Sequence, residues 1–181
     1  SLKIEGRMKR PEYVAVITKV YRQLIDTAIP LSRHRQDLLQ IFNRGGFTSG
    51  YYFGTKNCDM MCHEKPNNWG VFMGTVISSS RDSVTIKLER TLSVGDGIEF
   101  WIHNGDSFGQ TVDKIYIDRN LKNRAQSGQT ISLGTSRYIA PGTKVYKTSS
   151  IDQLEAVRKT FRTPYASRKI GVDMLAYFKI G

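Results

Sequence analysis

Apolar residues recur with two different spacings along the chain, and the change of spacing marks a change of structure. The first long stretch has helical spacing, and Pro11 suits its first turn, where a missing N–H costs nothing. Pro30 is expected to end this helix. Its predicted apolar face consists of Val14, Ile17, Tyr21, Leu24, Ile25 and Ala28.

A second helix is predicted after Pro30, with Ser32 as its N-cap and an apolar face that includes Leu38 and Leu39. Before the first helix, residues 2–6 alternate briefly between apolar and polar, which predicts a short strand that stops at Gly6. Residues 1–46 are therefore predicted as strand, helix, helix.

From Trp69 to Thr148 the spacing becomes two, which is typical of strands. Residues 47–68, which come before it, have no sustained period and are rich in aromatic residues, so they are predicted as a connector. Six short strands with turns between them favour a mainly β fold, a small six-stranded closed barrel over residues 69–148. The apolar positions of these strands are Val71, Met73, Val84, Ile86, Leu88, Ile98, Phe100, Ile102, Ile115, Ile117, Ile131, Leu133 and Val145.

Residues 149–181 begin with a helix, because Ser150 and Gln153 have the spacing of a capping box and Leu154, Val157 and Phe161 share one face. The barrel is thus flanked by helices on both sides. Residues 169–180 predict a further strand without a partner in view, as if a next segment started there. We therefore expect the chain to be a piece of a longer protein.

Composition places the chain among ordinary globular proteins. It has 181 residues, of which 39% are hydrophobic and 24% charged, enough for one domain or two small ones. No apolar run approaches 18 residues and no signal peptide is visible, so we expect no membrane partner. Only two cysteines are present, which favours a reducing, cytoplasmic setting.

The formal net charge of +11 is unevenly distributed. Up to Lys56 there are ten Lys and Arg residues against four Asp and Glu, so the helical ends are more basic than the middle. Such a charge favours a phosphate-rich partner such as a nucleic acid, and it is equally compatible with a protein that is simply basic.

Several sequence blocks resemble one known family. The run SLKIEGRMKRPEYVAVITKVYRQLID at residues 1–26 closely resembles the segment that ends the catalytic domain of the collagenase-like peptidases, peptidase family U32. FNRGGFTSGYYFG at 42–54 resembles the next block of that family. KPNNWGVFMGTV at 65–76 and LSVGDGIEF at 92–100 resemble the barrel of its longer, bacterial members. Residues 4–7 also match a recognition sequence used to remove expression tags, but the family motif continues across them, which favours a native origin.

This resemblance implies that residues 1–46 are the remnant of an upstream catalytic barrel. It also implies that residues 69–148 are similar to the second domain of elongation factor Tu. Some relatives carry an iron–sulfur cluster on four cysteines and serve hydroxylation of transfer or ribosomal RNA, whereas others are described as collagen-degrading peptidases. Cys58 and Cys62 do not match the cluster ligands by position, so no cofactor is expected on this chain, and a cluster is expected only in the missing upstream domain.

Two functions follow from the resemblance. The first is an accessory region of a collagenase-like peptidase, a hydrolase, which helps a missing upstream catalytic domain of the same chain to bind peptide. The alternative is an RNA-binding barrel of an iron–sulfur-dependent tRNA or rRNA hydroxylation protein, with structured RNA as the partner. In neither case is this chain expected to be catalytic alone.

Charged residues at the end of the first predicted strand are the leading substrate-binding candidates. They are Lys3, Glu5, Arg7 and Lys9. In a barrel of alternating strands and helices the site lies where strands end, and the fork of donors of Arg7 suits a carboxylate or phosphate. The alternative is an ion pair that ties the strand to the helix.

Arg44 is a further substrate-binding candidate, because it stands among Phe47, Tyr51, Tyr52 and Phe53. Arginine beside exposed rings suits the stacking of unpaired bases. We favour the alternative, in which the rings form the apolar contact between helices and barrel.

Basic residues in the predicted barrel loops are the RNA-contact candidates, since such loops suit a phosphate backbone. They are Lys87, Arg90, Arg119, Lys122 and Arg124. The alternative for them is a solvated loop.

Cys58, Cys62 and His63 resemble half a metal site, but a closed zinc site needs four ligands, so we predict free thiols and no metal. The catalytic residues stay unknown, because no complete catalytic constellation appears.

Overall fold

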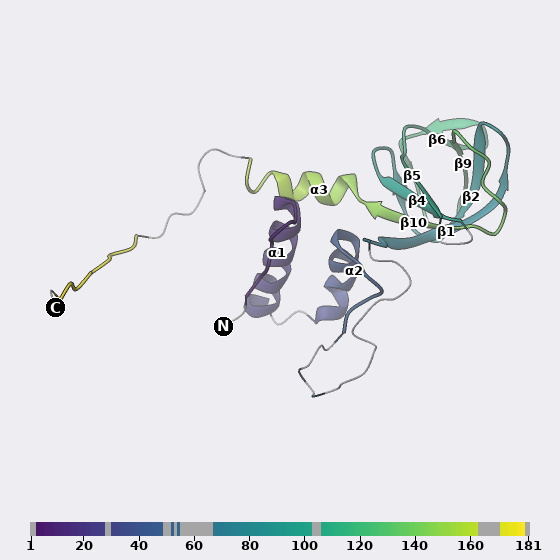
Figure 1. The fold of residues 1–181 in the computed structure, drawn as a ribbon. Helices are drawn as coiled ribbons and strands as arrows, with labels where there is room; N and C mark the ends of the chain where they lie inside the picture. Colours follow the sequence, from purple (N-terminus) through teal and green to yellow (C-terminus); the bar gives the residue numbers. More distant parts are fainter. Residues whose placement is uncertain are drawn as a thin grey trace.

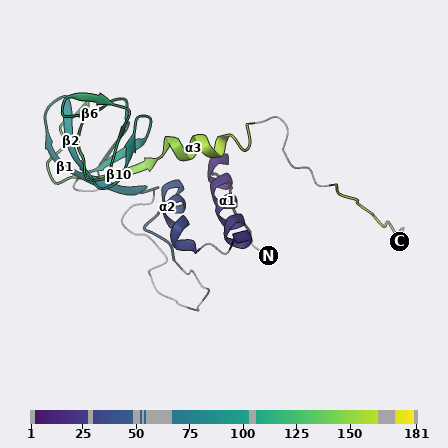
Figure 2. The same cartoon turned by 180° about the vertical axis from the view of Figure 1, so that it is seen from behind.

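In the part of the chain that the structure describes, three helices pack beside a curled antiparallel sheet (Figure 1). The computed structural model describes residues 3–27, 30–48, 52, 54, 67–102, 106–162 and 171–179. The helices are α1 (Pro11–Thr27), α2 (Leu31–Ile41) and α3 (Ile151–Arg158). Seen from behind, α1 and α2 lie side by side, and α3 runs from the sheet across the end of α1 (Figure 2).

The described part of the chain contains ten strands. They are β1 (Val71–Ser79), β2 (Ser83–Leu88), β3 (Leu92–Ser93), β4 (Gly97–Trp101), β5 (Ser107–Thr111), β6 (Ile115–Ile117), β7 (Asn120–Lys122), β8 (Arg124–Ala125), β9 (Thr130–Gly134) and β10 (Lys144–Ser149). Eight of them form one antiparallel sheet in the order β5-β4-β10-β1-β2-β9-β6-β7, and β3 pairs with β8.

The inner face of the sheet holds the main hydrophobic core. Alternating residues of each strand point inward, so β2 and β9 each alternate between buried and more exposed positions along their length. The largest fully buried side chains are Phe100, Met73, Ile86, Leu88, Leu92, Ile98, Ile115, Ile131, Leu133 and Ile139. All six predicted strands are present, and the alternation is strict in β2, β4 and β9.

The sheet is not closed, so the prediction of a six-stranded closed barrel similar to the second domain of elongation factor Tu is wrong. Among the described residues β5 pairs only with β4, and β7 pairs only with β6. The gap between β5 and the end of β9 is bridged by side chains instead of a backbone ladder. The amide of Gln110 donates to the carbonyl of Gly134 at 2.8 Å, and Arg137 pairs with Asp106 at 2.9 Å.

A second, smaller core holds the helices together. Val16 and Val20 of α1, Leu38 of α2 and Val157 of α3 are buried against one another. The helix predicted to begin at Pro11 is confirmed as α1, and Pro30 lies outside it.

Three local predictions fail. Residues 3–6 form no strand; Gly6 instead accepts a bond from the N–H of Lys9 at 2.9 Å in a turn. Ser32 lies inside α2, whose N-cap residue is Pro30. The described residues 171–179 form no strand either, and their large apolar side chains are exposed.

No helix in the described part of the chain is both long and apolar enough to cross a membrane.

Candidate functional site

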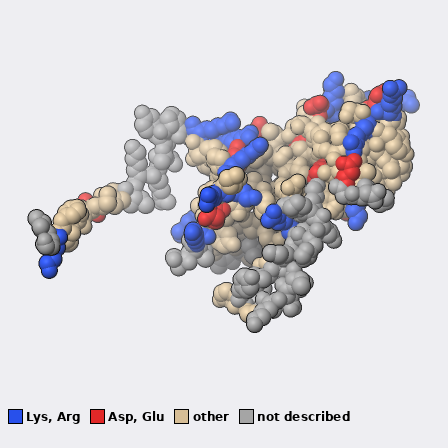
Figure 3. Space-filling model, in the orientation of Figure 1, with Lys and Arg blue, Asp and Glu red and all other residues tan. Residues whose placement is uncertain are grey.

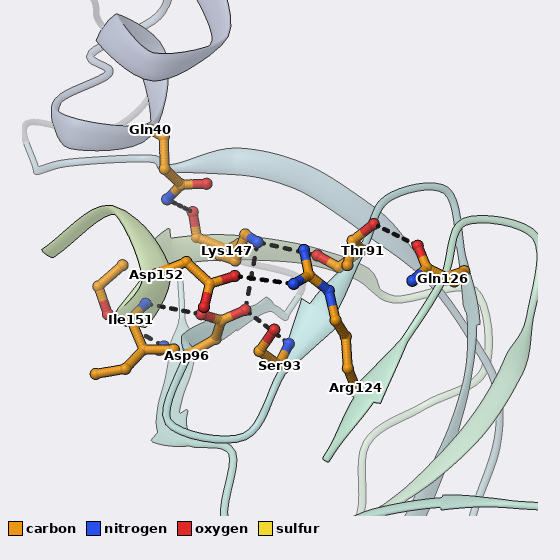
Figure 4. Close-up of polar contacts among 11 residues, drawn as sticks. Gln40, Thr91, Ser93, Asp96, Arg124, Gln126, Lys147, Ile151 and Asp152 are labelled. Atoms are coloured by element: carbon orange, nitrogen blue, oxygen red, sulfur yellow. Dashed lines mark hydrogen bonds and ion pairs between the residues drawn. The ribbon is translucent and has the colours of Figure 1, made fainter. Parts of the chain in front are cut away.

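A network of buried polar groups joins the sheet to the helices, and Asp96 in the turn between β3 and β4 is its centre (Figure 4). Its Oδ1 accepts the N–H of Ile151 at 2.9 Å. Its Oδ2 accepts the N–H of Ser93 at 2.9 Å and the ammonium of Lys147 at 3.3 Å. The side chain of Asp96 is only 1% exposed, so Lys147 and the two N–H groups replace the water that its charge has lost.

Asp96 also acts as the cap of α3. The predicted capping box of Ser150 and Gln153 is wrong, because Ser150 makes no side-chain cap bond. Gln153 instead donates to the carbonyl of Asp37 in α2 at 2.9 Å. A carboxylate from a distant turn therefore satisfies the first N–H of the helix, where the helix dipole also favours a negative charge.

The end of α2 is held against β10 and the segment before β1. The amide of Gln40, which is buried, donates to the carbonyl of Lys147 at 3.0 Å. The side-chain amide of Asn43 donates to the carbonyl of Gly70 at 2.6 Å, and the backbone N–H of Asn43 donates to Asn68 Oδ1 at 2.8 Å. Gly70 has φ 69°, and a Cβ there would collide with the carbonyl of Lys147. Only glycine fits this close approach.

An ion pair ties α1 to α3. Arg158 Nε donates to Glu12 Oε1 at 2.7 Å, and both side chains are largely covered. This hydrogen bond holds the pKa of Glu12 below its usual 4.5, although burial acts in the opposite direction.

A cavity of about 330 Å³ lies among these contacts. It is lined by the loop before α1, the end of α2, Asn68, and the turn from β10 into α3. Lys9 and Arg10 supply cations, and Asn68 and Ser149 supply amide and hydroxyl groups. The ammonium of Lys9 lies 3.4 Å from the centroid of the Phe42 ring. The carboxylate of Glu12 also lines the cavity, but it is paired with Arg158. The lining is therefore net positive and suits an anionic group, a carboxylate or a phosphate, and binding sites often lie where two parts of a protein meet.

Of the four predicted residues around Arg7, only Lys9 lines this cavity. The ammonium of Lys3 lies 3.9 Å from a carboxylate oxygen of Glu5, and both side chains are mostly exposed. Glu5 accepts the backbone N–H of Arg7 at 2.8 Å, so it orders the loop there. The four residues lie in a turn before α1 rather than at a strand end.

Arg44 lies in the exposed turn after α2. The ring of Phe47 is approached at 5.4 Å by the guanidinium of Arg35. Tyr52 is 86% exposed, and Tyr51 and Phe53 lie outside the described residues. Neither the stacking surface nor the apolar contact predicted for these rings is tested by this arrangement.

Two of the predicted RNA contacts hold the sheet to its loops. The ammonium of Lys87 donates to the carbonyl of Gly128 at 2.6 Å, and Arg90 Nε donates to the carbonyl of Phe72 at 3.1 Å. Both remain exposed on the surface.

The other three lie at and beyond the β6–β7 hairpin. Asp118 and Arg119 have φ of 49° and 65° and form its two-residue turn, and Lys122 ends β7. All three are exposed. Arg124 lies 3.4 Å from Asp152 of α3, so it also belongs to the network around Asp96.

Sequence reasoning missed an aromatic and basic row on the outer face of the sheet. The strand register places Trp101 beside Lys144, Lys144 beside Thr75, and Thr75 beside Lys87. The Trp101 ring stacks on Tyr146 at 4.2 Å with 25° between the planes. No sequence signal predicts the row, because it depends on the pairing of β4, β10, β1 and β2. Lys and Arg side chains are visible over both the helices and the sheet in Figure 3.

Cys58, Cys62 and His63 lie outside the described residues. In the described ranges, no three His, Cys, Asp or Glu residues are grouped closely enough to hold a metal ion. A cluster held by four cysteines does not fit a chain that has two.

Comparison with known proteins shows that part of the chain is similar to one protein family. Residues 1–61 match the sequence model of peptidase family U32. The chain is 26% identical over 160 residues to an uncharacterized protease of Methanocaldococcus jannaschii, covering 81% of this chain and 39% of that protein. It is 27% identical over 165 residues to a collagenase of Porphyromonas gingivalis, covering 80% and 38%.

A further relative is the tRNA hydroxylation protein P1 of Bacillus subtilis, 30% identical over 128 residues, covering 64% of this chain and 30% of that protein. A crystal structure of the C-terminal domain of a Geobacillus thermoleovorans protein assigned as a U32 peptidase is also similar. It has 22% identity and a TM-score of 0.40, and it covers 42% of this chain and 91% of that one. The chain thus spans about two fifths of the length of the first curated relatives, 39% and 38%.

Proposed function

We propose that the chain is a substrate-binding accessory region whose catalytic partner lies outside it, on the basis that residues 1–61 match the sequence model of peptidase family U32. The cavity of about 330 Å³ is the observation that carries this proposal. Lys9 and Arg10 reach it from the family segment, whereas Asn68 and Ser149 reach it from the sheet side. A ligand bound there touches both parts at once.

The rigidity of the contact supports the same role. The Asp96 network fixes α3 on the sheet, Gln40 fixes α2, and the pair of Glu12 and Arg158 fixes α1. A substrate held in the cavity is therefore kept at a defined distance from residues 1–61, the part of the chain that matches the family model. Binding energy is useful for catalysis only when the geometry is held in this way.

A binding assay with two probes tests this proposal. The full chain is titrated against a labelled denatured-collagen peptide and against a labelled transfer RNA, and fluorescence anisotropy is recorded. We expect at least one probe to bind, and Lys9→Ala to weaken that binding about tenfold, because one charge-assisted hydrogen bond is lost.

Lys3→Ala is the matched control, since it removes an exposed lysine of the same loop outside the cavity. It should leave the affinity unchanged. Equal effects of Lys3→Ala and Lys9→Ala, or no binding of either probe, would contradict the proposal.

A structured RNA is a second candidate for the substrate, and the outer-face row of Trp101, Lys144 and Lys87 favours it. Aromatic rings beside cations on the outer face of a sheet suit unpaired bases and their phosphates. The Trp101 ring is already packed against Tyr146 and Trp69, so the cations are the more accessible part of the row. The similarity to a tRNA hydroxylation protein points the same way. In this form of the proposal, an iron–sulfur cluster belongs to a part of the protein outside this chain.

The RNA candidate is tested by the same tRNA titration at low and moderate salt. Lys144→Ala should weaken binding and reduce the salt slope by about 0.7 to 0.9, the value for one lost phosphate contact. Lys19→Ala on α1 is the control of equal charge on another face. Arg124→Ala is a poorer choice, because it also breaks the pair with Asp152. Absence of binding at low salt, or equal effects of the two lysine variants, would exclude this candidate.

A further inference from the structure

The two edge strands of the sheet are protected very differently. β7 at one edge has only three residues, ends in Lys122 and follows a turn that carries Arg119. Short length and charge are the usual ways in which proteins block an edge. β5 at the other edge has five residues, SFGQT, with no proline, no charge and a continuous register with β4. The β5 edge therefore lacks these protections.

The backbone groups of β5 divide into two sets. The N–H of Val112 donates to the carbonyl of Asp96 at 2.9 Å, and the N–H of Ile102 donates to that of Asp106 at 3.0 Å. In an antiparallel ladder such bonds recur at every second residue. The N–H and C=O groups of Gly109 and Thr111 therefore point away from β4, toward the open edge.

A crevice of about 640 Å³ lies along this edge. Its lining includes the apolar side chains of Phe108 and Leu133, the polar ones of Gln110 and Thr111, and the charged pair Asp113 and Lys114. The lining thus mixes apolar and polar side chains, and its one cation, Lys114, is next to its one anion, Asp113. This lining suits a chain whose side chains alternate between apolar and polar.

Two glycines lie in this part of the sheet: Gly109 is an exposed residue of the edge strand β5, and Gly134 lines the crevice. A Cβ on Gly109 would meet only the carbonyl of Ile98 at 3.7 Å, and a Cβ on Gly134 would meet nothing within 4 Å. Neither glycine is needed for the packing of the fold. Glycine inside a strand often marks a place where another backbone approaches closely.

We propose that the β5 edge binds an extended peptide segment of a partner protein by strand addition. The segment pairs with the free backbone groups of Gly109 and Thr111, and its alternate side chains enter the crevice. Gln110 releases the carbonyl of Gly134 as the segment enters. This site is separate from the cavity at Lys9 and from the outer-face row, so it stands whether or not the proposed function is right.

Amide hydrogen exchange in the ¹⁵N-labelled full chain tests the proposal. The probe is an acetylated peptide of alternating Val and Thr with a lysine at each end. At saturation the amides of Gly109 and Thr111 should exchange at least ten times more slowly than without peptide. No added protection at millimolar peptide would overturn the proposal.

Gly109→Pro removes one free-edge N–H and no ladder bond, a change that edge strands tolerate. It should weaken peptide binding at least tenfold, whereas Gly109→Ala should not. If Gly109→Pro fails to fold, the same peptide with N-methyl groups on its alternate amides replaces it, and this peptide should not bind the unchanged protein.

Three results would overturn the proposal, and two of them would assign the edge to another occupant. Binding that survives both the proline variant and the N-methylated peptide excludes strand addition. Protection of the same amides that rises with protein concentration alone assigns the edge to a second copy of this chain. Protection by tRNA instead of peptide assigns it to a nucleic acid.

Discussion

The sheet has two boundaries that are built in opposite ways. At the junction with the helices, a carboxylate that is 1% exposed holds Lys147 and caps α3. At the crevice beside β5, the corresponding ion pair of Arg137 and Asp106 is 42% and 61% exposed. A buried ion pair holds its neighbours in one arrangement, because breaking it would leave a charge without water or a partner. An exposed ion pair contributes little to stability and can rearrange. The junction is thus built to keep a position, and the crevice is built to accept a change.

Removal of the Asp96 carboxylate at the junction should lower the free energy of unfolding more than any other change proposed below. Asp96→Ala leaves the largely buried ammonium of Lys147 with the carbonyl of Thr91 but without its carboxylate, and it leaves the N–H groups of Ser93 and Ile151 without their acceptor. We expect a loss of about 3 kcal/mol or more in the free energy of unfolding, measured by denaturant titration.

Asp106→Ala is the matched change at the crevice, and it should cost less than about 1 kcal/mol because its pair is exposed. Similar losses for the two variants would remove the distinction between the boundaries.

A methyl group added at Gly70 should cause the next largest loss of stability. Gly70→Ala forces a non-glycine residue to φ 69° and drives its Cβ into the backbone of β10. We expect a loss of about 2 kcal/mol in the free energy of unfolding. Gly134→Ala, where the Cβ meets open space, is the control and should leave the unfolding midpoint unchanged. An unchanged midpoint in Gly70→Ala would mean that α2 and β10 are not in close contact.

The fold could be predicted where a local pattern decides it. Pro11 and the spacing of apolar residues gave α1, and strict alternation gave β2, β4 and β9. β5, with the sequence SFGQT, and β3, β7 and β8, with two or three residues each, carry no such pattern. They are strands only because a partner strand lies beside them. Closure of the barrel could not be predicted for the same reason, since it depends on whether the two edges meet.

The candidate site was predicted in part. Lys9 was selected from its loop and lines the cavity, although the strand that was expected to place it does not form. Asp96 stands within the block LSVGDGIEF, and no pattern in that block predicts its role. Its role as a helix cap depends on Ile151 and Lys147, which the fold brings from far along the chain. A distant cap leaves no signal in the sequence of the helix that it serves.

Acid should weaken the contact between α1 and α3. The pKa of Glu12 in the folded protein lies below 4.5, so the stabilisation is present above that pH and is lost as the pH falls through the folded pKa. Glu12→Gln should lower the free energy of unfolding by about 1 kcal/mol at neutral pH. The difference from the unchanged protein should shrink as denaturant titrations move from pH 6 down to about pH 3. A difference that stays constant with pH would show that the charge of Glu12 contributes nothing.

The two boundaries can be compared most closely through two glutamines, because each boundary contains one glutamine whose side chain donates to a backbone carbonyl. Gln40 is buried and donates to Lys147 at 3.0 Å, and Gln110 is less buried and donates to Gly134 at 2.8 Å. Gln40→Ala leaves a carbonyl of β10 without its donor beneath α2, so it should cost about 1 to 1.5 kcal/mol. Gln110→Ala exposes the carbonyl of Gly134 to water, which replaces the lost bond, and the cost should be about 0.5 kcal/mol or less. Denaturant titrations of both variants measure the difference directly. If Gln110→Ala cost as much as Gln40→Ala, the crevice would be as fixed as the junction, and strand addition beside β5 would have to overcome a closed structure.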